Sequence, residues 1–190
     1  MKKIIPLLAV IFFITACGNK NNAQVFYLDA VKEYKNQNFE KALILTEKAI
    51  YQKRNFYQAE FLKAKILFFT KDYQGAEILF KKLTKKKSEN YDFKLWLLRC
   101  LIFNGKFEEA DLYLTKLIQS NTEDWRLYYY KAQISKYENN FEKYFSNLNT
   151  ADSFLKDSSA VYLDLGLIWH EFGMPEKSSL YYSKAQILCK

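Results

Sequence analysis

The chain has 190 residues, of which 49% are hydrophobic, and it contains only 5 Gly and 2 Pro. This length allows a sizeable buried core, and the shortage of helix breakers favours long α-helices over a strand-rich fold. The 29 Lys and Arg residues exceed the 21 Asp and Glu residues only modestly, and no nucleic-acid-binding motif accompanies them, so no nucleic-acid partner is expected.

The N-terminal residues have the pattern of an export signal. Lys2 and Lys3 precede an apolar run, residues 4–16, that is too short to span a bilayer and has the length of a signal-peptide core. The run ends in Ile14-Thr15-Ala16-Cys17, which resembles the lipobox of bacterial lipoproteins. The resemblance implies removal of residues 1–16 and attachment of fatty acyl chains such as palmitate to Cys17. The alternative is an ordinary secretory peptide in which the cysteine is incidental.

The segment after Cys17 is polar, and we expect residues 17–22 to be a lipidated cysteine with a flexible tether. Several acyl chains on one residue would hold the protein durably at a membrane. Gly18 follows the cysteine, and the absence of Asp there favours the outer membrane, facing the periplasm, in an organism with two membranes. In an organism with one membrane, the same signal places the protein on the outer face of the cell.

The rest of the chain, residues 23–190, repeats with a period of 34 residues. Four columns of similar residues keep this step over five copies without an insertion. The columns are Ala30, Ala64, Leu98, Ala132, Gly166; Phe39, Tyr73, Phe107, Phe141, Pro175; Ala42, Ala76, Ala110, Tyr144, Ser178; and Ala49, Leu83, Leu117, Ala151, Ala185. Small residues in the first and third columns would allow two helices to approach closely, and polar residues before the second column predict a hairpin loop.

The period and residue types resemble the tetratricopeptide repeat, most clearly in the last copy, which reads Tyr162-x2-Leu165-Gly166-x2-Trp169. The resemblance implies an all-α fold, a right-handed α-solenoid of about five helix-turn-helix repeats. We place the repeats at about 23–56, 57–90, 91–124, 125–158 and 159–190.

Two features depart from the family pattern. The proline that commonly ends the repeat is replaced, by Arg54, Ser88, Thr122 and Lys156. Several positions of the first helices that are large and apolar in the family are polar here, namely Asp29, Glu60, Lys63, Lys94 and Lys131. The simplest interpretation is that these helices are shifted by one residue and that the hairpin loop is one residue shorter.

The first helices of such repeats line a concave surface that binds peptides or helices in this family. Without the shift, the groove residues are Tyr27, Tyr34, Phe61, Lys65, Phe68, Phe69, Leu95, Arg99, Phe103, Tyr129 and Tyr137. With the shift, most of these aromatic residues belong to the core, and Phe69, Phe103 and Tyr137 remain beside Lys32, Lys35 and Lys136. Both alternatives stay open, and the partner-binding candidates are Phe69, Phe103, Tyr137, Lys65, Arg99 and Tyr34.

The expected function is therefore a lipid-anchored scaffold of the cell envelope that binds another envelope protein or a peptide segment of one. Lipoproteins of this architecture help assemble envelope complexes, although a fold does not by itself define a function. The alternative is an accessory subunit of an export or solute-uptake complex that binds through another surface. The sequence leaves the oligomeric state open.

Catalysis and cofactor binding are not expected. His170 is the only histidine, and no phosphate-binding loop or cluster with metal-ligand spacing accompanies it. Cys100 and Cys189 lie in apolar helical patterns, so we expect free or buried thiols.

A basic run, Lys85-Lys86-Lys87, lies where an inter-repeat turn is expected. It is interpreted either as a solvated turn or as a contact with anionic lipid headgroups.

Overall fold

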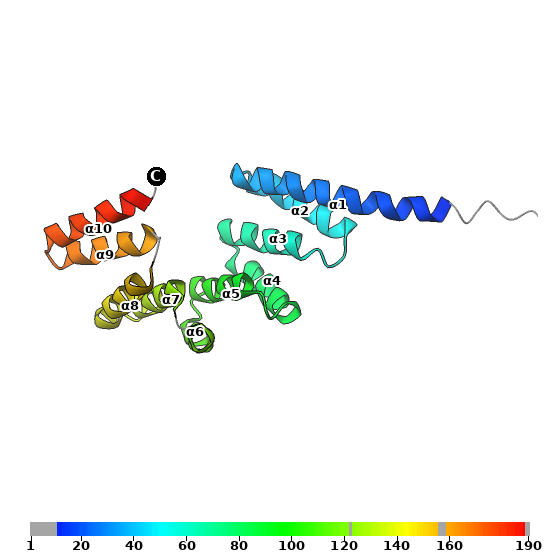
Figure 1. Ribbon diagram of the computed structural model, residues 1–190. Coiled ribbons are helices and arrows are strands. Elements are labelled where there is room, and N and C mark those ends of the chain that lie inside the picture. Colours follow the sequence, from blue (N-terminus) through cyan, green and yellow to red (C-terminus); the bar gives the residue numbers. More distant parts are fainter. Residues whose placement is uncertain (1–10, 122, 156–158, 189–190) are drawn as a thin grey trace, which may run out of the picture. The chain divides into compact units, whose positions relative to one another are not determined.

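The computed structural model describes residues 11–121, 123–155 and 159–188, with side chains from residue 22 to residue 187 across the same gaps. This part of the chain forms ten α-helices (Figure 1). They are α1 (Ile11–Lys35), α2 (Phe39–Gln52), α3 (Tyr57–Phe69), α4 (Tyr73–Lys86), α5 (Tyr91–Phe103), α6 (Phe107–Ser120), α7 (Trp125–Tyr137), α8 (Phe141–Phe154), α9 (Ser159–Glu171) and α10 (Pro175–Leu188). The contacts divide the chain within α5 into two compact units, residues 1–100 (unit 1) and 101–190 (unit 2).

The 34-residue period of the sequence is also the period of the helices. The helices α3, α5, α7 and α9 begin at residues 57, 91, 125 and 159, and each has 13 residues. The second helix of every pair begins in the column that starts with Phe39 and has 14 residues. The prediction of an all-α fold made of helix-turn-helix repeats is confirmed.

The structure differs from the expected flexible tether at residues 17–22, because α1 begins at Ile11 and continues through this segment. The segment contains no proline, and the single Gly18 costs a helix only about 1 kcal/mol, so a helix stabilised further along can extend into it. Lys2, Lys3 and the start of the apolar run lie outside the described residues. Of the described helices, none is both long enough and apolar enough to cross a bilayer.

The columns of small residues lie where the helices of a pair meet. Ala30, Ala64 and Ala132 of the first helices are fully buried, as are Ala42 and Ala76 of the second helices. In the last pair, a methyl group added to Gly166 would lie only 2.7 Å from the Tyr182 ring, so this position requires a residue without a side chain. The close approach predicted from these columns is therefore present.

Each hairpin loop has three residues, and its middle residue has a left-handed backbone conformation. These middle residues repeat at the 34-residue step, as Gln37, Lys71, Gly105, Asn139 and Gly173, with φ between 56° and 70°. In the second loop, the N–H groups of Lys71 and Asp72 donate to the carbonyls of Phe68 and Leu67 at 3.0 and 2.9 Å. This is the helix ending that favours glycine, because other residues strain in this conformation.

We expect Lys71→Gly to stabilise the protein. The substitution removes the strain of a left-handed lysine, and the greater flexibility of the unfolded glycine chain offsets part of the gain, leaving about 0.5–1 kcal/mol. The melting temperature should rise by roughly 1–3 °C in a thermal unfolding experiment. Gly105→Ala adds a methyl group into open space at a residue with the same left-handed conformation, and it should lower the melting temperature. Equal melting temperatures for the parent protein and the two variants would contradict this interpretation.

The shift of the first helices was expected to make the hairpin loop one residue shorter in the first four repeats than in the last. This loop-length prediction is wrong, because all five hairpins have loops of the same length. Two of the polar residues at apolar positions, Glu60 and Lys63, form ion pairs with neighbouring helices. The buried Glu60 carboxylate lies 3.2 Å from the Lys82 Nζ of α4, and Lys63 Nζ lies 2.6 Å from the Glu47 carboxylate of α2. These contacts were not predicted because they join residues 22 and 16 positions apart.

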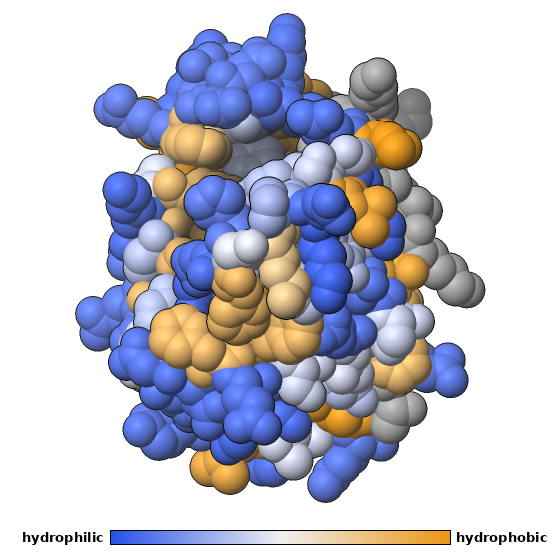
Figure 2. Space-filling model, turned by 90° about the vertical axis from the view of Figure 1, so that its left-hand side faces the viewer, coloured by the Kyte–Doolittle hydropathy of each residue, from blue (hydrophilic) through white to orange (hydrophobic). Residues whose placement is uncertain are grey.

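Each unit has its own core. In unit 1, Ala30, Ala42, Leu62 and Ile66 form one buried cluster between α1, α2 and α3. In unit 2, a cluster joins α7, α8 and α9, and consists of Ala132, Tyr144, Leu148, Ala151, Val161, Leu165 and Ile168. Hydrophobic side chains also reach the surface, and on the face drawn in Figure 2 they gather in patches between hydrophilic ones.

Candidate functional site: an aromatic and cationic cluster

The most distinctive surface feature of unit 1 is a group of rings and cations contributed by the first helices of three successive repeats. We call it the aromatic–cationic cluster, and it consists of Tyr34 (α1), Phe61, Lys65 and Phe69 (α3), and Trp96 and Arg99 (α5). Residues on the same face of a helix recur every three or four positions, which explains the spacing of the members on α3 and α5. The members on each of these helices therefore lie on one face of it.

The rings of the cluster form a continuous series of contacts. The ring centroids of Tyr34 and Phe69 are 5.9 Å apart, and those of Phe69 and Trp96 are 6.0 Å apart with an edge-to-face geometry. Phe61 meets Trp96 edge-to-face at 6.4 Å. Trp96 in turn stacks on the fully buried Phe80 of α4 at 5.7 Å. The aromatic surface is thus held in place by the core of unit 1.

Two cations lie over these rings. Lys65 Nζ is 4.9 Å from the Tyr34 centroid and 5.4 Å from that of Trp96, while the Arg99 guanidinium is 5.0 Å from the Trp96 centroid. Such contacts stabilise a partly desolvated cation through the negative face of the ring. Burial, together with the nearby charge of Arg99, lowers the pKa of Lys65, and the Asp92 carboxylate opposes this effect. Burial raises the pKa of Tyr34, although Arg99 acts in the opposite direction. The cluster therefore holds two positive charges close together in a partly apolar setting, an arrangement that favours an anionic group.

The structure brings four of the six predicted partner-binding residues together, namely Tyr34, Lys65, Phe69 and Arg99. Phe69 is 42% exposed, whereas its neighbour Phe68 is 4% exposed and belongs to the core. Phe103 and Tyr137, the other two candidates, lie in unit 2 and are 46% and 56% exposed. Tyr137 stacks on Phe107 with centroids 4.7 Å apart.

Burial differs among the residues listed for the groove. Phe68 and Leu95 are core residues, while Tyr34 and Phe61 are half-buried. Trp96 was not among the predicted residues, although it contacts Lys65 and Arg99. Its position five residues after Tyr91, the first residue of α5, corresponds to Tyr130 and Asp164 in the following repeats, so the repeat columns did not mark it as special.

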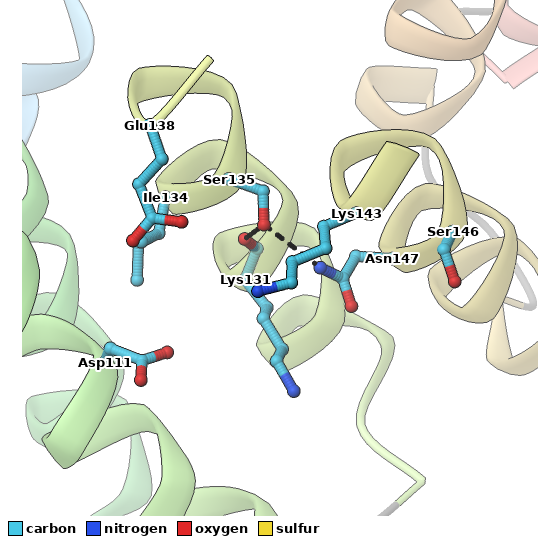
Figure 3. A pocket seen from close by; sticks show the side chains of 8 residues that line it. All are labelled: Asp111, Lys131, Ile134, Ser135, Glu138, Lys143, Ser146 and Asn147. Carbon is cyan, nitrogen blue, oxygen red and sulfur yellow. Dashed lines mark hydrogen bonds between the residues drawn. The ribbon is translucent and has the colours of Figure 1, made fainter. Parts of the chain in front are cut away.

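Unit 2 contains a polar recess of about 330 Å³ between α6, α7 and α8. Figure 3 shows Asp111 projecting from α6 toward the side chains of α7, with Ser146 and Asn147 coming from α8. Asn147 Nδ2 donates to Ser135 Oγ at 3.3 Å. The two lysines of the lining are matched by two carboxylates, and Ile134 is its one apolar residue, so the recess lacks the apolar lining of a typical small-molecule site.

A half-buried carboxylate, Asp164 of α9, connects two repeats of unit 2. Gln133 Nε2 of α7 donates to Asp164 at 2.9 Å. Burial raises the pKa of Asp164, against the opposing effects of the Gln133 hydrogen bond and the charge of Lys136. A carboxyl whose pKa is raised by folding binds its proton more tightly in the folded state. Its contribution to stability is therefore complete below the unfolded pKa of about 3.9 and is lost as the pH rises through the folded pKa.

We expect Asp164→Asn to be at least as stable as the parent protein at about pH 7, because the amide avoids the cost of burying a charge and still accepts from Gln133. At about pH 4 the difference should disappear. Thermal unfolding of both proteins across this pH range checks the prediction. A variant that is less stable at neutral pH and equal in acid would contradict it.

Cys100 is a free, fully buried cysteine, as expected. Burial is the main cause that raises the pKa of its thiol to about 12, assisted by the charge of Glu77. Because the thiolate is the reactive form, we expect no reaction of Cys100 with a thiol reagent in the folded protein and rapid reaction after unfolding. A variant with Cys17→Ser and Cys189→Ser isolates this thiol, and fast labelling without denaturant would contradict the assignment. Cys189 lies outside the described residues.

His170 is exposed near the end of α9. Among the described side chains, no group of three His, Cys, Asp or Glu residues lies close enough to hold a metal ion.

Comparison with known proteins identifies the repeat. Residues 67–134 match a family model described as Tetratricopeptide repeat. No curated protein matches the chain significantly.

Solved structures of similar fold cover most of the chain. MamA 41-end from Desulfovibrio magneticus RS-1 is 16% identical and has a TM-score of 0.66, over 88% of this chain and 94% of that chain. TTC0263, a thermophilic TPR protein in Thermus thermophilus, is 17% identical with a TM-score of 0.73, and the match covers 87% of this chain and 91% of that chain. A tetratricopeptide repeat protein from Parabacteroides merdae ATCC 43184 is 17% identical with a TM-score of 0.78, and the match covers 88% of this chain and 65% of that chain. The helix period and these shared folds together show that the chain has the fold of tetratricopeptide repeat proteins, and residues 67–134 also match the family model.

Proposed function

We propose that this protein is a scaffold that binds another protein through the aromatic–cationic cluster. The observation that carries the proposal is the placement of Lys65 and Arg99 among the rings of Tyr34, Phe69 and Trp96. Trp, Tyr and Arg are the residues that contribute most often to the energy of protein interfaces. The helices that present them are packed against the core, so little conformational entropy is lost when a partner binds.

The chemistry of the cluster defines the partner segment. A carboxylate of the partner would lie between Lys65 and Arg99, and an apolar or aromatic side chain next to it would pack on Phe69 and Trp96. Hydrogen bonds to charged groups contribute about 1.5–3 kcal/mol each. The expected ligand is therefore an amphipathic segment that carries Asp or Glu beside a large apolar residue.

The proposed location is the cell envelope, with the protein anchored by lipid on Cys17. The support is the order of a basic start, a short apolar run and Ala16-Cys17 in the sequence. We place it at the outer membrane, facing the periplasm, where it assists the assembly of an envelope complex. Metabolic labelling with a fatty acid analogue tests the anchor, and labelling that persists in Cys17→Ser would dismiss it.

The binding proposal is tested by crosslinking in intact cells followed by titration with a peptide of the captured partner. Lys65→Met and Arg99→Met keep an unbranched side chain that can pack on the rings but remove the charge. Each should weaken binding roughly 10- to 100-fold, the loss of one charged hydrogen bond. Lys65→Arg and the exposed Ile78→Ala on α4 are the matched controls and should bind normally. Replacing the acidic residue of the peptide by its amide should abolish the difference between Lys65 and Lys65→Met.

The second candidate is an accessory subunit that binds face to face through the first repeat. That mode requires an exposed apolar surface, and α1 and α2 provide one. Phe26, Ile44 and Tyr51 line a shallow recess of about 660 Å³, and Tyr51 is 87% exposed. Ile44→Ser with Tyr51→Ser would then disrupt capture. If the methionine variants of the cluster bind normally and this variant does not, the second candidate replaces the first.

A further inference from the structure

A second surface of unit 1, separate from the aromatic–cationic cluster, is the outer face of α4. It consists of Ile78, Lys81, Lys82, Lys85 and Lys86, which recur at helical spacing around a shallow recess. The opposite face of α4, with Ala76, Glu77, Phe80 and Leu83, is buried. No acidic residue lies on the outer face, and Ile78 is 62% exposed.

The other second helices do not share this composition, so the repeat fold does not require it. At the positions that correspond to the four lysines, each of the other second helices carries at most one lysine. The corresponding residues are Glu47, Lys48, Tyr51 and Gln52 in α2; Thr115, Lys116, Gln119 and Ser120 in α6; Asn149, Thr150, Ser153 and Phe154 in α8; and Ser183, Lys184, Ile187 and Leu188 in α10. The positive charge is therefore concentrated on one helix.

Two of the lysines have acidic partners and two do not pair with an acid. Lys81 Nζ lies 2.8 Å from the Glu77 carboxylate, and Lys82 lies 3.2 Å from that of Glu60; both carboxylates are buried. Within the described part of the chain, neither Lys85 nor Lys86 forms an ion pair. These two lysines can thus meet an external anion without loss of an internal ion pair.

Further cations join this surface from another segment. Lys86 Nζ donates to Asn55 Oδ1 at 3.1 Å, which brings the end of α4 to the turn between α2 and α3. That turn carries the exposed Lys53 and Arg54, and Lys87 follows directly after α4. We call this combined surface, residues 53–54 with the outer face of α4 and Lys87, the basic face.

We propose that the basic face binds the surface of an anionic lipid bilayer. Lysine is depleted in protein–protein interfaces, and every cation of this face except Arg54 is a lysine, so a specific protein site is disfavoured. Flexible lysines around one exposed isoleucine suit a fluid array of lipid phosphates, to which each lysine contributes without a fixed geometry. The proposal does not depend on the function of the aromatic–cationic cluster.

The test is amine footprinting of the full chain, in which an acetylating reagent in water labels accessible lysines and mass spectrometry reads each site. The chain is acetylated in the presence of phosphatidylcholine vesicles and, separately, in the presence of vesicles that also contain phosphatidylglycerol. Each lysine at an anionic surface strengthens binding about five-fold, so several together hold this face on the anionic vesicles. Labelling of Lys85 and Lys86 should therefore fall on the anionic vesicles relative to phosphatidylcholine and recover in high salt. Lys116 and Lys143, exposed in unit 2, serve as internal controls and should change little.

Three results would overturn the proposal. Equal labelling of Lys85 and Lys86 on both kinds of vesicle would show that the basic face makes no lipid contact. Equal protection of Lys116 and Lys143 would show general adsorption of a basic protein. Protection by soluble polyglutamate without protection by anionic vesicles would assign the face to an acidic protein instead. Because the unmodified chain is used, no outcome depends on the folding of a variant.

Discussion

Phe80→Ala is expected to destabilise unit 1 by about 3–5 kcal/mol, the usual cost of removing a buried phenylalanine ring. Phe80 of α4 is fully buried, meets Phe61 edge-to-face at 5.8 Å and stacks on Trp96 at 5.7 Å. Its removal leaves a cavity between two repeats, and the surrounding helices relax only partly. Equilibrium unfolding in urea measures the change.

Ile78→Ala is the control for this prediction, because Ile78 lies on the same helix but is exposed. It should change stability by less than about 0.5 kcal/mol. A loss below about 1 kcal/mol for Phe80→Ala would mean that the ring is not part of a well-packed core. Since Phe80 supports Trp96, the variant should also weaken binding at the aromatic–cationic cluster, which links the core of unit 1 to its proposed function.

Leu148→Ala is expected to destabilise unit 2 by about 2–5 kcal/mol. Leu148 of α8 is fully buried in a cluster with Ala132 of α7 and with Val161 and Leu165 of α9, so its side chain joins two successive repeats. Stability in repeat proteins is approximately a sum of the repeats and their nearest-neighbour interfaces. The loss should therefore appear as faster amide hydrogen exchange in α7, α8 and α9.

The neighbouring substitution Asn149→Ala is the matched control, since Asn149 is exposed on the same helix, and it should leave exchange nearly unchanged. Uniform acceleration of exchange over all helices of the chain by Leu148→Ala would contradict the nearest-neighbour description. It would indicate instead that both units unfold as one cooperative body.

Much of the fold was predictable because the repeat encodes it locally. The column of Ala30, Ala64 and Ala132 predicts close helix packing, and a single period of 34 residues sets the starts of the helices. The left-handed conformation of the middle loop residues was harder to predict from the sequence, because Gly105 and Gly173 indicate it while Gln37 and Lys71 do not. Their conformation is imposed by the two packed helices that the loop joins, at a cost in local strain.

The candidate site was predicted in part. Phe69, Phe103 and Tyr137 were chosen because they face or border the predicted groove whether or not the first helices are shifted, and all three are exposed. The predicted shorter loop was wrong because polar residues at apolar positions do not require a shift of the helix. Glu60 is buried all the same, since Lys82 reaches its carboxylate from the next helix, and no local pattern contains that information.

The sequence alone determined the helical class, the repeat and the concentration of lysines near residue 85, since each is a property of residue types at fixed spacing. The export and lipidation signal ending at Cys17 is inferred from the sequence in the same way and remains a prediction. Only the tertiary structure decided which residues meet: that Lys65 and Arg99 share the rings of three helices, and that Lys86 joins the turn at Asn55. The physical reason is that these contacts connect residues about 30 positions apart or more, where packing of whole helices sets the distance.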